Sequence, residues 1–167
     1  MKAKLIVEGK EFDIEIQDPE LQKLVAPKKK TGYEKAGEGH TYSFVDSYGE
    51  IKTMDHEDDD DNQRFVDANY YSNYLVAENN ARADKLMRQL RRFAVEHRSI
   101  GLDWSEGSKT KWAIYYDRKA KKLEVVDSCN AQNFGTIYFD MALHAHKAIE
   151  TFYNELIWYF TEYKDSI

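Results

Sequence analysis

Along residues 3–16, apolar side chains alternate with polar ones on both sides of a turn at Gly9. This period of two is typical of a β-hairpin that presents one apolar face. Asp18 and Pro19 come next, and they suit the N-cap and the first position of a short helix. The pattern therefore predicts a hairpin, a short helix and a polar linker within residues 1–30.

The rest of the chain resembles two copies of one design. Residues 41–54 and 113–126 each alternate as a hairpin, and Asp46 and Asp117 fall at matching turns. In each copy an acidic or polar loop, a short strand with paired aromatic residues and a helix follow the hairpin. Self-similarity on this scale favours stacked supersecondary units over a single catalytic domain around a deep cleft.

Helical spacing of apolar residues marks the end of each copy. In the first copy the buried stripe is expected to comprise Ala83, Leu86, Leu90 and Phe93. In the second copy the expected stripe is Ala142, Ala145, Ile149, Phe152, Tyr153, Leu156 and Phe160.

These patterns predict an α+β fold. Two hairpin-strand-helix units, residues 31–99 and residues 100–167, form antiparallel sheet packed by helices. The hairpin in residues 1–30 is an N-terminal arm that precedes them.

Trp158 falls almost opposite the apolar stripe of the terminal helix, so an exposed indole is predicted there. An exposed tryptophan has two interpretations. It packs beneath the N-terminal arm, or it anchors a partner protein.

The chain has a net charge of -6, which disfavours direct binding to nucleic acid or to an anionic membrane. Charges recur through the first residues and no apolar run is long enough to span a bilayer, so a cytosolic protein is expected. The single cysteine, Cys129, excludes an internal disulfide.

The strongest local feature is the acidic segment of residues 54–62, which is expected to be an extended, solvated loop. An EF-hand is excluded because the required Gly and Glu positions are not filled. Three interpretations stay open: a divalent-metal site that includes His56, a decoy that occupies the Lys and Arg side chains of a nucleic-acid-binding protein, or a loop without a role. The decoy interpretation assigns partner binding to Asp55, Glu57, Asp58, Asp59, Asp60 and Asp61.

Catalytic motifs are not found in the sequence, so no catalytic residue and no cofactor is assigned. Asp140 and His144 lie one helical turn apart, and with Cys129 or His56 they could hold zinc. The ordinary alternative makes Asp140 a helix cap and His144 a surface residue.

The segments KKKTGYEKAGEGHTYSFVDSYGE, KWAIYYDRKAKKLEVVD and GTIYFDMALHAHKAIETFYNELIWYF resemble a group of small phage and prophage proteins of Gram-positive bacteria. Accessory phage proteins of this kind include type II anti-CRISPR inhibitors, which are small, acidic and non-enzymatic. The resemblance implies a fold and an origin more than an activity.

Together the residues and the resemblance predict a phage-encoded, non-enzymatic inhibitor in the cytoplasm of the host bacterium. It is expected to bind a host nucleic-acid-binding effector protein, a CRISPR nuclease, and to block DNA loading through its acidic segment, with Trp158 and Trp104 as anchors. The alternatives are a zinc-binding enzyme or nucleotide-acting protein, and a phage structural or assembly factor.

Overall fold

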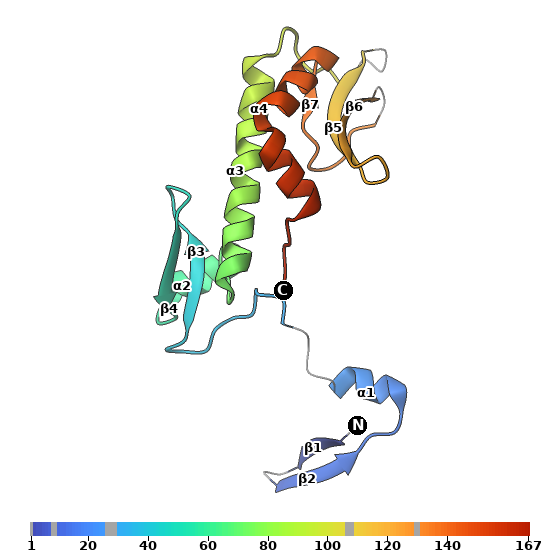
Figure 1. Ribbon diagram of the computed structural model, residues 1–167. Coiled ribbons are helices and arrows are strands. Elements are labelled where there is room, and N and C mark those ends of the chain that lie inside the picture. The colour runs from blue at the N-terminus through green and yellow to red at the C-terminus, as the bar shows by residue number, and fades with distance from the viewer. Residues whose placement is uncertain (1, 8–9, 26–29, 106–108, 129–130) are drawn as a thin grey trace. The chain divides into compact units, whose positions relative to one another are not determined.

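The computed structural model describes residues 2–7, 10–25, 30–105, 109–128 and 131–167. The chain divides into two compact units, Met1–Thr31 and Gly32–Ile167. Figure 1 shows the ribbon of both units.

The N-terminal unit contains the predicted hairpin and helix. Strands β1 (Lys2–Val7) and β2 (Lys10–Glu15) pair antiparallel, with Leu5 opposite Phe12. Helix α1 (Pro19–Val25) begins after Asp18, whose carboxylate accepts hydrogen bonds from the amides of Glu20 and Leu21. Asp18 therefore caps the helix as its sequence position predicts.

The second unit holds two small antiparallel sheets. In the first, β3 (Thr41–Val45) pairs with β4 (Ile51–Asp55), and Tyr71 forms an isolated antiparallel bridge with Ser43. In the second, β5 (Lys111–Asp117) lies between β6 (Lys122–Ser128) and the short β7 (Tyr138–Phe139).

Helix α3 (Tyr74–Glu96) runs past both sheets of this unit, as Figure 1 shows. We call residues 32–99 the first half of the unit and residues 100–167 the second half. It contacts β3 and β4 and also packs against α4 (Ala142–Thr161), which in turn contacts β5, β6 and β7. The expected stripe on α3 is confirmed, because Ala83, Leu86 and Leu90 are buried and Phe93 packs, partly buried, against the same core. The helices in the described part of the chain are too short or too polar to cross a bilayer.

The internal match found in the sequence is visible in the structure. In each half, a segment with paired aromatics adds to the first strand of the hairpin from the side opposite the second strand. The matched turn residues also act alike. The Asp46 carboxylate accepts from the amides of Tyr48 and Glu50, and the Asp117 carboxylate accepts from two amides of its own turn. The α+β fold class is therefore confirmed.

Helix α4 is broken at Phe152, whose backbone angles (φ -114, ψ 21) are not helical. Next to this break, the Thr151 hydroxyl donates to the carbonyl of Lys147 at 2.8 Å. A threonine that bonds back to the preceding turn in this way often accompanies a bend in a helix. The helix therefore changes direction here, while Ala145 and Ala148 before the break and Leu156 after it belong to one core cluster.

The structure corrects the predicted position of Trp158. Trp158 is only 8 % exposed, so the prediction of an exposed indole is wrong. The guanidinium of Arg82 lies 4.0 Å from the centre of the indole, and the ring of Tyr163 lies beside it. Glu155 holds Arg82 in place through two hydrogen bonds of 2.8 and 3.0 Å. Tyr153, expected in the core, is 53 % exposed instead.

Replacing Leu156 with Ala should lower the free energy of unfolding by about 2 to 5 kcal/mol, because Leu156 belongs to the core formed by α3, α4 and β7. Tyr153→Ala is the matched control on the same helix and should change stability by about 0.5 kcal/mol or less. Urea unfolding followed by circular dichroism measures both. Equal losses in the two variants would contradict this description of α4.

Trp158→Ala should lower the unfolding free energy by about 3 kcal/mol or more, because it removes a buried ring and the cation–π contact with Arg82. Trp158→Phe keeps an aromatic face beneath the guanidinium and should recover part of that loss. Differential scanning calorimetry tests the pair. A melting temperature unchanged in Trp158→Ala would show that the indole is not part of the core.

Candidate functional site

The acidic segment is more ordered than its charge predicts. Residues 59–66 form helix α2 (Asp59–Val66), and Asp58 is its N-cap. The Asp58 carboxylate accepts from the amide of Asp61, while the Asp61 carboxylate accepts from the amide of Asp58, which completes a reciprocal capping box. The expectation of an extended loop is therefore wrong for residues 59–62, which are helical, whereas the expected solvent exposure holds for the carboxylates of the segment other than Asp61. The run of carboxylates suits the positive end of the helix dipole.

Asp61 is the residue that fixes this arrangement. It is 1 % exposed, so its assignment to a partner-binding surface is wrong. One carboxylate oxygen accepts from the Tyr42 hydroxyl and from the Arg64 guanidinium at 2.8 Å. The other accepts from the amide of Glu57 at 2.7 Å. A buried carboxylate requires such partners, because an unpaired one would lose most of its solvation energy.

These contacts shift the pKa values of the Asp61 carboxyl and the Tyr42 hydroxyl in opposite directions. The hydrogen bond from Tyr42, together with the amides of Glu57 and Asp58 and the charge of Arg64, holds the pKa of Asp61 well below its usual range although burial opposes this. Burial and the Asp61 carboxylate raise the pKa of Tyr42 to about 12, against the opposing effect of Arg64. Tyr42 thus stays protonated and donates to an ionised Asp61 at neutral pH.

Stacked aromatic rings extend this network across the sheet. The ring of Tyr70 stacks on Tyr42 at 3.9 Å with an interplanar angle of 6°. The Tyr70 hydroxyl accepts from the amide of Ala36 at 3.1 Å and lies 3.3 Å from Nδ1 of His56. His56 therefore contacts aromatic side chains of the first half.

Sequence reasoning did not assign Tyr42, Arg64 or Tyr70 to this site. The signal was weak but present. Asp61 and Arg64 have the spacing of an ion pair on one helix face, and Tyr42 lies at an apolar position of the alternating hairpin. Neither signal shows that Tyr42 meets Asp61.

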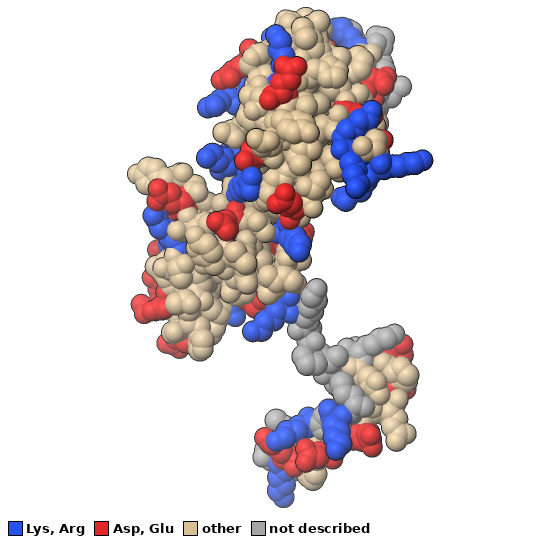
Figure 2. Space-filling view, viewed as in Figure 1, with Lys and Arg blue, Asp and Glu red and all other residues tan. Residues whose placement is uncertain are grey.

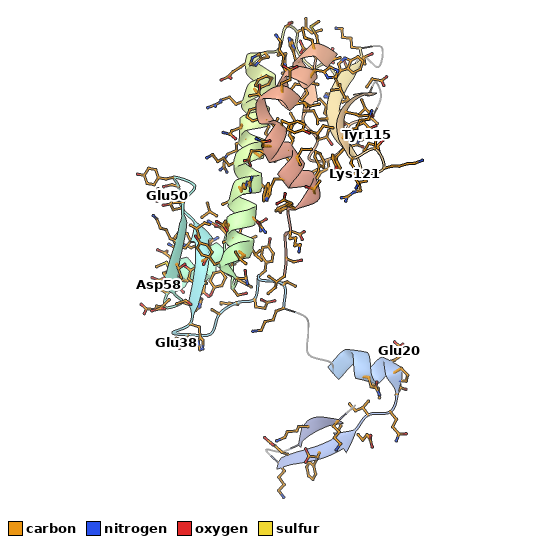
Figure 3. All side chains as sticks on the ribbon, in the orientation of Figure 1. Glu20, Glu38, Glu50, Asp58, Tyr115 and Lys121 are labelled. Atoms are coloured by element: carbon orange, nitrogen blue, oxygen red, sulfur yellow. The ribbon has the colours of Figure 1, made fainter. Side chains whose placement is uncertain are left out.

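The remaining carboxylates of the segment are on the surface. Figure 2 shows acidic groups over the β3–β4–α2 region, and Figure 3 labels Asp58 and Glu38 there. A shallow depression of about 530 Å³ beside them is lined in part by Lys35, His56 and Asn62. We call the exposed carboxylates the acidic surface, which comprises Asp55, Glu57, Asp58, Asp59 and Asp60.

The structure brings together two of the residues considered for zinc. Nδ1 of His144 lies 2.7 Å from one oxygen of Asp140, and the other oxygen accepts from the amides of Ser99 and Ile100. Burial disfavours ionisation of Asp140, but these partners outweigh it and lower its pKa. The pair therefore joins the start of α4 to the segment that follows α3.

The other two metal candidates do not join this pair in the described structure. His56 lies beside Tyr42 and Tyr70, and Cys129 is outside the described residues. Within the ranges that the structure describes, no group of three His, Cys, Asp or Glu side chains is arranged to hold a metal ion.

Trp104, considered with Trp158 as an anchor, is partly buried. Its ring meets Tyr138 edge to face at 4.9 Å, and the ammonium of Lys111 lies 4.8 Å from its centre. Like Trp158, it has contacts within its own unit.

Comparisons with models of protein families, with curated proteins and with solved structures gave no match for this chain.

Asp61→Asn should lower the unfolding free energy by about 2 to 3 kcal/mol at pH 7, because an amide cannot accept from all the donors that face the carboxylate. The loss should depend on pH. The folded-state pKa of Asp61 lies below the unfolded value of about 3.9, so the wild type has this stabilisation above that pH and loses it as the pH falls further.

Urea unfolding at a series of pH values from neutral to acid measures this effect. The difference between wild type and Asp61→Asn should shrink as the solution is acidified. Asp60→Asn is the matched control, because Asp60 is exposed on the same helix. A difference that stays constant with pH would show that Asp61 is not ionised in the folded protein.

Proposed function

We propose that this chain is a phage-encoded, non-enzymatic inhibitor that acts in the cytoplasm of a host bacterium. It binds a nucleic-acid-handling effector protein, a CRISPR nuclease, through the acidic surface and blocks the loading of DNA. The observation that carries this proposal is the exposure of Asp55, Glu57, Asp58, Asp59 and Asp60 beside the buried Asp61 network.

The chemistry of the acidic surface matches a protein that binds phosphates. Lys and Arg side chains that hold a nucleic-acid backbone meet negative charges at short, regular spacing, and each can accept a carboxylate in place of a phosphate. Charge complementarity of this kind raises the association rate and disfavours partners of the wrong sign.

The buried network adds preorganisation. Because Asp61 binds the amides of Glu57 and Asp58, it fixes the backbone that carries the exposed carboxylates. A surface that is already ordered loses less conformational entropy on binding than a flexible acidic tail would. This supports recognition of one docking geometry.

The choice of a CRISPR nuclease follows from two features considered together. The sequence resembles accessory phage proteins, some of which are inhibitors of bacterial defence. An effector that loads DNA has a channel lined with positive charge, which is the surface that a row of carboxylates would occupy.

The test neutralises the acidic surface except for Asp58, which caps α2, and it leaves Asp61 unchanged. Combining Asp55→Asn, Glu57→Gln, Asp59→Asn and Asp60→Asn should weaken binding to the effector by about tenfold or more, mainly through a slower association rate. It should also reduce the dependence of affinity on salt. A pull-down from a Gram-positive host identifies the effector, and surface plasmon resonance at several salt concentrations measures the binding.

A second quadruple variant provides the control because it removes the same charge from other exposed positions. It combines Asp127→Asn, Glu150→Gln, Glu162→Gln and Asp165→Asn. This control should bind with wild-type kinetics at moderate salt. Equal binding by wild type and the acidic-surface variant would refute the proposal, as would wild-type protein that leaves DNA loading by the captured effector unchanged.

A further inference from the structure

An apolar pocket opens in the second half of the Gly32–Ile167 unit. It lies between α3, α4, β5 and residues 134–137, and it has a volume of about 310 Å³. Leu90, Phe139 and Leu156 are buried core residues that form part of its wall. Phe134 also lines it, yet its side chain is fully exposed. The volume lies at the lower end of the range of about 300 to 1,000 Å³ that is usual for ligand pockets.

The turn between β5 and β6 is strongly basic. Arg118, Lys119 and Lys121 are all exposed, and none of the three forms an ion pair within the described part of the chain. Figure 3 labels Lys121 at this turn, and Figure 2 shows Lys and Arg side chains gathered there. We call these three residues the basic turn.

Tyr116 connects the basic turn to the pocket. It is near the end of β5, and its ring stacks on Phe160 at 5.8 Å with an interplanar angle of 13°. Phe160 lines the pocket. The basic turn therefore follows closely in sequence a ring that packs against one wall of the pocket.

We propose that the pocket and the basic turn together bind an acidic peptide segment of a partner protein. A large apolar side chain of that segment enters the pocket. Neighbouring Asp or Glu residues pair with Arg118, Lys119 and Lys121. This site is separate from the acidic surface, as the labels of Asp58 and Lys121 in Figure 3 show, and it does not rest on the function proposed above.

The lining of the pocket favours a peptide side chain over a nucleobase. The only polar side-chain groups among its described lining residues are the hydroxyls of Thr136 and Tyr159. A nucleobase would bury several donors and acceptors there with few partners, whereas a Leu or Phe side chain has none to satisfy. The net charge of -6 also disfavours a long polyanion more than a short acidic segment.

The backbone of the basic turn offers a way to separate binding from folding. Lys121 has a φ of 55°, in the left-handed region that glycine adopts more easily than lysine. Lys121→Gly therefore removes a positive charge while it relieves backbone strain. This variant should keep or raise the melting temperature and still bind the peptide less well.

Fluorescence anisotropy with the full chain provides the test. The probe is a fluorescein-labelled peptide in which Phe and Leu alternate with Glu, and the reference peptide has Ser in place of the apolar residues. We expect the first peptide to bind and the second to bind at least about tenfold more weakly. Lys121→Gly and Phe134→Ser should each weaken binding of the first peptide about threefold or more, and together about tenfold.

Two exposed positions elsewhere provide matched controls. Tyr48→Ser removes an exposed aromatic ring from the other hairpin turn, and Arg91→Ala removes an exposed charge from α3. Neither should change the affinity. The proposal is overturned if the peptide does not bind, if the two site variants bind it as wild type does, or if single-stranded oligo-dT binds at this site more tightly than the peptide.

Discussion

Helix α3 is the element on which both small sheets depend. A two-stranded sheet is marginal alone in water, and the three-stranded sheet includes a strand of only two residues, β7. Each becomes stable by burying one face against a helix. The β3–β4 hairpin packs against α3 directly, and the β5–β6–β7 sheet packs through α4, which rests on α3. Val76 and Ala77 at the start of α3 pack beside the β3–β4 hairpin, whereas Leu86 and Leu90 further along belong to the core beside the pocket, so one helix joins the two halves of the unit.

Much of this fold could be predicted from the sequence because local spacing determines it. The hairpins follow from alternation, α3 follows from its apolar stripe, and Asp18, Asp46 and Asp117 act at the cap and the two turns where the sequence places them. Each of these features is decided within a few residues. The paired aromatics after each hairpin also lie where the internal match puts them, at Tyr71 and Tyr138.

The candidate site was less accessible to sequence reasoning because it depends on contacts between distant residues. A run of carboxylates reads as solvated when each charge is counted without a partner. The spacing of Asp61 and Arg64 allows an ion pair, but nothing in the sequence shows that Tyr42 from a distant strand meets them. Trp158 was misplaced for a related reason. The apolar pattern of α4 does not show what lies against the opposite face of the helix, where Arg82 and Tyr163 cover the indole.

Each of the two hairpin turns is closed by one aspartate, which leaves its other residues open to change. The carboxylates of Asp46 and Asp117 each accept the hydrogen bonds that close their own turn. The side chains of the other turn residues make none of these bonds. One copy of the design could therefore acquire an exposed Tyr48 and the other three cations, with the same scaffold beneath. Two hairpins closed in the same way can thus carry unlike surfaces through their turn residues alone.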